Sequence, residues 1–198
     1  MVFEDDINSI DNIFNDLNHP NPNINIKAYE EMRRRWPEQS IQRLIENLDN
    51  KNIDIRRKSV KGIAYFGIDI VDKIIILYFS TNNETIMICC LKILTLIASK
   101  YDLIEFQEEL NILIESALAT TSPEITLMSI SLLRQIGEKS VPSLKLLCRD
   151  ENILKAKAAI TALIEINDSS LQLFLLELSQ DNKIDVLIRD NAKEALGI

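Results

Sequence analysis

The chain has 198 residues, of which 46% are hydrophobic and 26% charged, with 4 Gly and 5 Pro. This composition excludes wholesale disorder and low-complexity classes, and the length suits one domain or a short array of repeats with a buried core. The formal net charge is −8, so the chain repels phosphate backbones and nucleic acid is a poor candidate for a partner.

The first residues, 1–18, carry apolar side chains at helical spacing and predict an N-terminal capping helix ahead of a repeat domain over residues 19–198. Residues 1–11 are acidic and lack the basic and apolar regions of a signal peptide. No run approaches the roughly 18 apolar residues of a membrane span, so we expect no membrane insertion. Three cysteines form no even disulfide framework and fit a reducing compartment.

An internal repeat follows. Each repeat begins with a predicted helix in which a small residue lies four positions before an apolar one, as in Ser59 and Ile63. The small residues are separated by 31, 31, 39, 30 and 33 positions. They are Ala28, Ser59, Cys90, Ser129, Ala159 and Ala192. Because small side chains let helices approach closely, we expect consecutive repeats to stack.

A second amphipathic helix follows each first helix after a short turn. The second helices are predicted near residues 41–48, 71–78, 110–117, 141–148 and 171–178. Gly67, Gly137 and Asn167 stand where a first helix ends, a position that favours residues tolerant of the left-handed conformation. Ser122 and Ser140 precede early-turn prolines, so their hydroxyls are expected to cap helices.

The motif of an apolar residue, Arg, two further residues and a small residue occurs at Ile55–Ser59 and, with the same spacing, at Ile188–Ala192. This motif is typical of short HEAT-type repeats. The predicted fold is therefore all-α, an α-solenoid of about five helical hairpins plus a terminal half-repeat. The 39-residue spacing predicts an insertion near residues 99–109, as a longer loop between helices. Arg56 is expected to be a structural arginine that bridges to Asp54.

Candidate catalytic and metal-binding residues are scarce. The single histidine, His19, lies in a predicted turn, which excludes a multi-histidine metal site and most histidine-based catalysis. Cys89 and Cys90 are adjacent and lack chelating spacing, and Cys90 and Cys148 are interpreted as buried structural thiols. The four glycines are scattered and build no phosphate-binding loop. We therefore expect no catalytic residue and no metal site.

Positive charge is concentrated in residues 33–61, here called the basic segment. It holds nine Lys or Arg against four Asp or Glu, a net charge of +5, so the rest of the chain carries −13. Trp36 and Tyr65 lie within or beside it. One interpretation is a solvated charged face with structural ion pairs. The other is a cationic surface with an aromatic rim, which would bind an anionic ligand or an acidic partner.

Several motifs in the first third of the chain resemble one branch of short-HEAT proteins. They are His19–Pro22, the small residue Ala28, the Ile-x-x-Leu-Ile motif of residues 41–45, and the stretch Arg56–Gly67. These motifs are similar to those of the E/F-type phycobilin lyase family of cyanobacteria and red-lineage plastids. That family includes heterodimeric lyases, chaperone-like partners of lyases and a phycobilisome-degradation factor.

The resemblance implies a lyase subunit or a non-catalytic, chaperone-like partner that assists attachment of a phycobilin, a linear tetrapyrrole, to phycobiliprotein cysteines. It implies a phycobilin held transiently, with no permanent cofactor, and as partners a phycobiliprotein subunit and a second lyase subunit. The implied location is the cyanobacterial cytoplasm or the plastid stroma. Arg34, Arg57 and Lys61 would meet bilin propionates or the phycobiliprotein, and Trp36 and Tyr65 would be stacking surfaces. The alternatives are a HEAT adaptor without a ligand and a factor that promotes phycobilisome disassembly.

Overall fold

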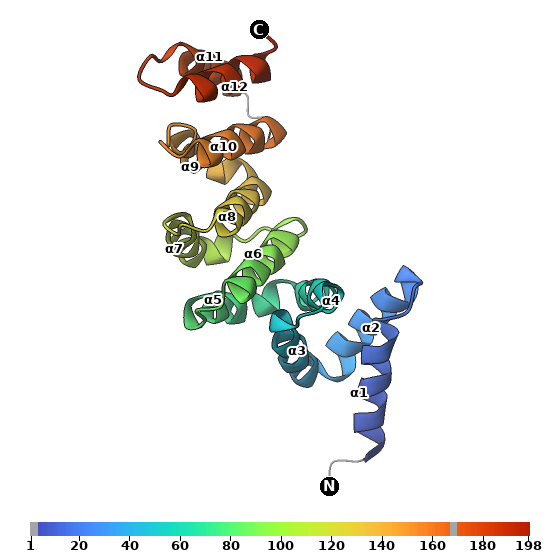
Figure 1. Cartoon of the computed structure of the whole chain (residues 1–198). Coiled ribbons are helices and arrows are strands. Elements are labelled where there is room, and N and C mark those ends of the chain that lie inside the picture. The colour runs from blue at the N-terminus through green and yellow to red at the C-terminus, as the bar shows by residue number, and fades with distance from the viewer. Residues whose placement is uncertain (1–3, 167–169) are drawn as a thin grey trace. The chain divides into compact units, whose positions relative to one another are not determined.

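The computed structural model describes residues 4–166 and 170–198, which form helices joined by short loops, with no strand in those ranges. The all-α fold class is confirmed, and longer first helices alternate with second helices along the chain (Figure 1). The α-helices are α1 (Glu4–Asp16), α2 (Pro22–Arg35), α3 (Pro37–Glu46), α4 (Ile53–Ala64), α5 (Val71–Ser80), α6 (Glu84–Ala98), α7 (Gln107–Leu118), α8 (Pro123–Ile136), α9 (Val141–Leu147), α10 (Ile153–Ile166), α11 (Leu171–Gln180) and α12 (Val186–Leu196). The 3-10 turns are η1 (Asn47–Asp49), η2 (Gly67–Ile70), η3 (Ile104–Phe106) and η4 (Gly137–Ser140).

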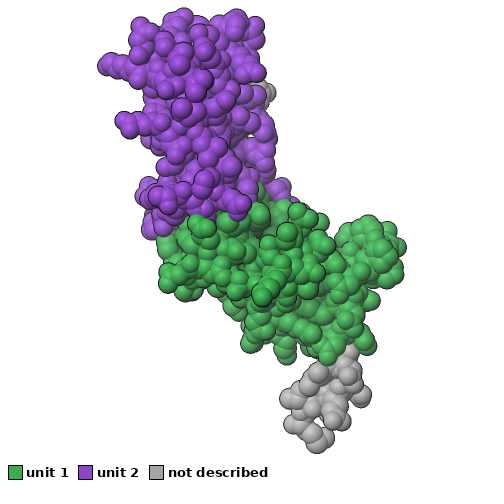
Figure 2. Space-filling model, in the orientation of Figure 1, with its two compact units in different colours: residues 1–97 green, residues 98–198 purple. Residues whose placement is uncertain are grey.

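The chain divides into two compact units, residues 1–97 (unit 1) and residues 98–198 (unit 2) (Figure 2). In unit 1, α1 packs against α2, and α3 packs against α2 and α4. In unit 2, α10 packs against α8, α9 and α12, and α11 packs against α12. First helices therefore pack on first helices within unit 2, as stacking in an α-solenoid requires. The boundary between a capping helix and a single repeat domain stays a prediction.

The small residue of each first helix is buried, as the repeat pattern predicts. All six are at most 3% exposed, namely Ala28, Ser59, Cys90, Ser129, Ala159 and Ala192. Ser129 satisfies its hydroxyl inside its own helix by donating a hydrogen bond to the carbonyl of Ile125 at 2.8 Å. The repeat register therefore marks the positions where a first helix contacts the core.

The first helices share a capping residue that the sequence analysis did not identify. An Asn or Asp side chain precedes most of them and accepts a hydrogen bond from a backbone N–H of the first turn, at 2.8–3.0 Å. These residues are Asn21, Asn52, Asn83, Asn152 and Asp185. With Ser122 before α8, they repeat at the same spacing as the small residues. A side-chain acceptor at this position satisfies one of the unpaired donors at the start of a helix.

Helix ends agree with the glycine prediction but not with the serine prediction. Gly67 and Gly137 have φ values of 70° and 79°, in the left-handed region that glycine adopts without strain. Ser122 and Ser140 do precede helices, but neither side chain caps the helix that follows. The Ser140 hydroxyl instead donates to the backbone carbonyl of Leu133 at 2.6 Å, which ties η4 back to α8. The predicted helix end at Asn167 lies outside the described residues.

Three helices of unit 1 converge at Gly62 in α4. A Cβ atom at this position would lie 2.9 Å from the Tyr29 ring of α2 and 3.1 Å from a methyl group of Leu44 in α3. We expect Gly62→Ala to lower the free energy of unfolding by about 1–3 kcal/mol, because crowding outweighs the roughly 1 kcal/mol by which Ala is favoured over Gly in a helix. Urea unfolding followed by circular dichroism measures this change. Lys61→Ala, at the exposed neighbouring position, is the control, and equal stability of the two variants would contradict the close packing.

Candidate functional site

Two residues of the predicted binding surface lie at the end of α2. Arg34 is exposed and donates two hydrogen bonds, of 2.7 and 2.8 Å, to the carboxylate of Glu31 one turn earlier. This bond from Arg34 holds the pKa of the Glu31 carboxyl below its usual value. Trp36 joins α2 to α3 and is only 8% exposed, with the Arg35 guanidinium 4.1 Å from the centre of its ring. The Trp36 ring is therefore covered here rather than presented as an open stacking surface.

The other three predicted residues lie along α4 and directly after it. Arg57 and Lys61 are one helical turn apart and exposed, so their charges share one face of α4. Arg57 lies 3.8 Å from Asp54, a solvent-exposed pair that contributes little. Tyr65 is half-buried, stacks on Tyr29 with ring centres 5.7 Å apart, and donates a hydrogen bond to Glu30.

Several other cations of the basic segment have partners within unit 1. Arg33 pairs with Asp69 at 3.1 Å, and Arg43 pairs with Asp11 and lies over the Phe14 ring. The expected bridge from Arg56 to Asp54 is wrong. The Arg56 guanidinium instead donates to the backbone carbonyls of Asn50 and Lys51, at 2.5 and 3.2 Å, and so braces the loop before α4. Among the described residues no ion pair involves Lys51 or Lys61, and both are exposed, so Lys51, Lys61 and the weakly paired Arg57 are the cations most accessible to a partner.

His19 and the cysteines lie in structural positions. The His19 Nδ1 atom accepts a hydrogen bond from the backbone N–H of Asn21 at 3.0 Å, as expected of a turn residue. Cys89, Cys90 and Cys148 are buried free thiols. Burial raises the pKa of Cys90 and of Cys148 to about 12, so both remain protonated at neutral pH. This agrees with the interpretation of Cys90 and Cys148 as structural thiols.

The thiol burial makes a prediction about pH. In the folded chain at pH 8 we expect Cys90 and Cys148 to react with a disulfide reagent at least ten-fold more slowly than after denaturation in guanidinium, because the thiolate is the reactive form.

Burial also raises the pKa of Tyr29 to about 12. The folded state thus holds these protons more tightly than the unfolded chain, whose thiols titrate near pH 9. The resulting stabilisation is complete below about pH 9 and is lost as the pH rises toward 12, which melting temperatures between pH 8 and 11 would reveal. For the reactivity prediction, fast reaction of Cys90 or Cys148 in the folded chain at pH 8 would contradict their assignment as buried structural thiols.

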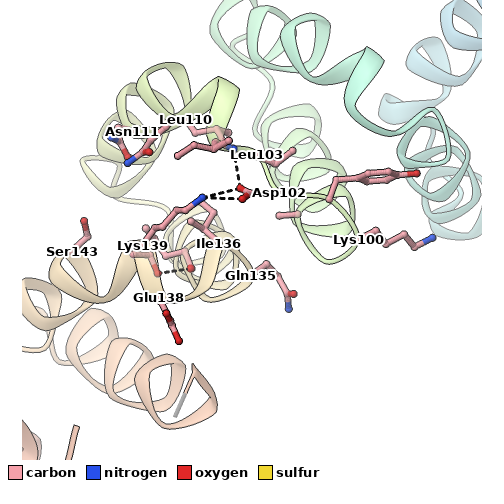
Figure 3. Close-up of a pocket in the computed structure, with 16 residues that line it drawn as sticks. Lys100, Asp102, Leu103, Leu110, Asn111, Gln135, Ile136, Glu138, Lys139 and Ser143 are labelled. Carbon is pink, nitrogen blue, oxygen red and sulfur yellow. Dashed lines mark hydrogen bonds and ion pairs between the residues drawn. The ribbon is translucent and has the colours of Figure 1, made fainter. Parts of the chain in front are cut away.

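A pocket of about 490 Å³ lies in unit 2, beside the predicted insertion, and is here called the insertion pocket. The insertion is confirmed as residues 99–106, a loop followed by η3 that separates α6 from α7. Leu110 and Asn111 project into the pocket from α7, and Lys139 and Ser143 project from the η4–α9 segment (Figure 3). The sequence analysis did not predict this pocket, although the 39-residue spacing marked the segment that forms its wall.

An ion pair spans the insertion pocket. The Lys139 Nζ atom donates to both carboxylate oxygens of Asp102 at 3.0 Å, and the backbone N–H of Ile104 donates to Asp102 Oδ1 at 3.0 Å (Figure 3). The Lys139 ammonium lowers the pKa of Asp102, so this carboxylate stays ionised at neutral pH. The pair links the insertion loop to η4, 37 residues away in the sequence, and both side chains remain partly exposed.

Among residues 4–166 and 170–198, no three His, Cys, Asp or Glu side chains cluster closely enough to hold a metal ion. In the same ranges, no helix has the length and apolar character needed to cross a membrane.

Two curated proteins are similar to this chain. The bilin biosynthesis protein CpeZ of Synechococcus sp. (strain WH8020) is 24% identical over 165 residues, which cover 80% of this chain and 89% of CpeZ. The uncharacterized phycocyanin operon protein Z of Pseudanabaena tenuis (strain PCC 7409) is 25% identical over 189 residues, covering 95% and 94% of the two chains. No protein-family model matches the chain.

Among solved structures, an engineered protein of the Northeast Structural Genomics Consortium aligns with a TM-score of 0.52 and 14% identity, over 96% of this chain and 95% of that one. At this identity the likeness concerns the fold alone. The names of these two relatives concern bilins and a phycobiliprotein operon, as the resemblance to phycobilin lyases predicts, and they specify no mechanism.

Proposed function

We propose that this chain assists the attachment of a phycobilin to phycobiliprotein cysteines, as a lyase subunit or as the chaperone-like partner of one. The observation that carries the proposal is the similarity to the bilin biosynthesis protein CpeZ, which extends over 89% of that protein. The similarity to a phycocyanin operon protein, over 94% of its length, supports the same context.

In the proposed mechanism the helical repeats bind and orient the reactants and take little part in the chemical step. The acceptor protein supplies the cysteine thiolate that forms the thioether bond to the bilin. The helper holds the flexible tetrapyrrole or the acceptor in one orientation, which lowers the entropic part of the activation barrier. Arg34, Arg57 and Lys61 would then meet bilin propionates or acidic groups of the acceptor, with Tyr65 beside them. Trp36 would have to be uncovered before it could stack on a ligand, because Arg35 covers its ring.

Co-expression tests this proposal directly. A phycoerythrin subunit is produced together with bilin-synthesis enzymes and a cognate lyase subunit, with and without this chain, and the covalently bound pigment is quantified by absorbance and zinc-enhanced fluorescence in gels. We expect the chain to raise the yield of chromophore-bearing subunit several-fold. An unchanged yield with both phycoerythrin and phycocyanin subunits would overturn the proposal.

The alternative of a protein adaptor has one observation in its favour. Second helices of unit 2 expose large apolar side chains, with Leu146 75%, Leu173 71% and Ile112 60% exposed. These side chains belong to α7, α9 and α11, and a contiguous patch of such side chains would be typical of a protein-binding surface. A pure adaptor would bind its partner equally well with and without pigment, whereas a disassembly factor would prefer the subunit that already carries its chromophore. Pull-down of the apo and pigmented forms of one subunit separates these alternatives.

A further inference from the structure

The insertion pocket is separate from the surface on which the proposed function places its ligand contacts. Arg34, Arg57 and Lys61 belong to unit 1, whereas every residue that lines the insertion pocket belongs to unit 2. Its volume of about 490 Å³ falls within the range of roughly 300–1,000 Å³ that is typical of small-molecule sites. The pocket exists because the third repeat carries additional residues between its two helices, so it is not a general feature of the repeat.

The lining of the insertion pocket combines apolar and polar side chains without a net charge, which suits a ligand that has both an apolar surface and neutral hydrogen-bonding groups. Leu103, Leu110 and Leu133 are buried and contribute apolar surface to the pocket. The ionisable side chains in the lining balance, because Lys100 and Lys139 are matched by Asp102 and Glu138. The pocket therefore offers no net attraction to a carboxylate, in contrast to the exposed cations of α4. The neighbouring amide of Asn111 and hydroxyl of Ser143 add neutral hydrogen-bonding groups.

The Lys139–Asp102 pair has unused hydrogen-bonding capacity on both members. An ammonium has three donors, and Lys139 directs bonds to the two oxygens of Asp102. Asp102 Oδ1 accepts from both Lys139 and Ile104, whereas Oδ2 accepts from Lys139. One ammonium donor of Lys139 and one lone pair of Asp102 Oδ2 therefore have no hydrogen bond within the described residues, and both residues line the pocket. A cyclic amide, or lactam, presents the complementary arrangement, a C=O acceptor adjacent to an N–H donor on a flat ring.

We infer that the insertion pocket binds a lactam end ring of a linear tetrapyrrole. The lactam edge would bond to Lys139 and Asp102, and the ring would lie against the buried leucines that line the pocket. This inference rests on the proposed function for its ligand, since the two end rings of a bilin are lactams. The propionate groups lie on the two central rings of the same molecule and are left outside the pocket.

The first test measures the affinity of the full chain for biliverdin, by following the absorbance of biliverdin as the protein is added. Ser143→Trp places an indole in the pocket from an exposed position early in α9, and we expect it to weaken biliverdin binding at least ten-fold. Leu173→Trp is the matched control, because Leu173 has the same register in α11, two residues after a buried first residue, and lines no part of the pocket. We expect it to bind biliverdin as the unmodified chain does.

A second arm identifies the recognised group. Biliverdin dimethyl ester keeps both lactams and lacks free carboxylates, so we expect its affinity to stay within about three-fold of that of biliverdin. Lys139→Met removes the ammonium donor. We expect it to weaken the binding of both compounds about ten-fold or more, as loss of a charged hydrogen bond does. Failure of the ester to bind would overturn lactam recognition in favour of carboxylate recognition.

The outcomes separate the two proposals. If the unmodified chain binds biliverdin and Ser143→Trp leaves the affinity unchanged, the pocket assignment is overturned while bilin handling stands. If the unmodified chain binds neither biliverdin nor its ester, the pocket inference is overturned, and the co-expression experiment decides the proposed function by itself. Weakened binding in Ser143→Trp and Lys139→Met, with normal binding in Leu173→Trp and retained binding of the ester, supports the inference.

Discussion

Replacing Leu163 with alanine is expected to lower the free energy of unfolding by about 2–5 kcal/mol. Leu163 lies in α10 and is completely buried. α10 packs against α8, α9 and α12, so a cavity at Leu163 weakens the contacts through which these helices stack. In a repeat protein, stability depends on the interfaces between neighbouring units, and a fault in a central helix affects those on both sides. Guanidinium unfolding monitored by circular dichroism measures the change.

The matched control for this substitution is Leu173→Ala in α11. It removes the same atoms from a side chain that is 71% exposed, so we expect a change below about 0.5 kcal/mol. If the chain acts as a protein adaptor, we expect Leu173→Ala to weaken the binding of a partner while the stability of the fold stays unchanged. Equal destabilisation by the two substitutions would contradict the burial of Leu163 between α10 and its neighbouring helices.

The repeat could be predicted from the sequence because each first helix carries small and apolar residues at the same spacing. The burial of Ser59, Ser129 and Ala159 follows from their spacing, since each lies on the core face of a helix with a 3.6-residue period. The Asn capping residues were equally periodic and could have been found from the same spacing. Their signal was missed because Asn is common in loops of this chain and only its position before each first helix is informative.

Contacts between side chains were predicted less well, because they depend on the path of the backbone. Asp54 is close to Arg56 in sequence, but the loop before α4 brings the carbonyls of Asn50 and Lys51 to the Arg56 guanidinium, while Asp54 lies near Arg57. The positive charge of the basic segment was counted correctly. Its neutralisation could not be predicted, since the partners of Arg33 and Arg43 lie 36 and 32 residues away.

The insertion pocket shows the same difference between local and long-range information. The spacing of 39 residues located the additional loop, but Asp102 and Lys139 are brought together only when the third and fourth hairpins pack. Neither residue belongs to a recognisable motif. A departure from the period of a repeat is therefore a signal for a candidate site even when its residue types are unremarkable.

The last prediction concerns Arg57 and Lys61, two exposed cations that share one face of α4. We expect the double substitution Arg57→Glu with Lys61→Glu to slow association with an acidic phycobiliprotein subunit about ten-fold at low ionic strength, because reversed charges on one face of α4 repel the partner instead of attracting it. Both side chains project from one helix face, and the Arg57–Asp54 contact is exposed, so the stability of the fold should change little. Stopped-flow or surface-plasmon measurements with the apo subunit give the association rate, and the effect should diminish as salt is added.

A control must reproduce the change in net charge at another place. Lys157→Glu with Lys183→Glu reverses two exposed lysines in unit 2 and alters the total charge by the same amount. If the basic segment is the contact surface, this control slows association much less than the α4 double substitution. Equal slowing by the two doubles would mean that the partner responds to total charge, and the assignment of Arg57 and Lys61 to a binding surface would then be wrong. A salt-dependent difference confined to the α4 double would place the encounter on unit 1.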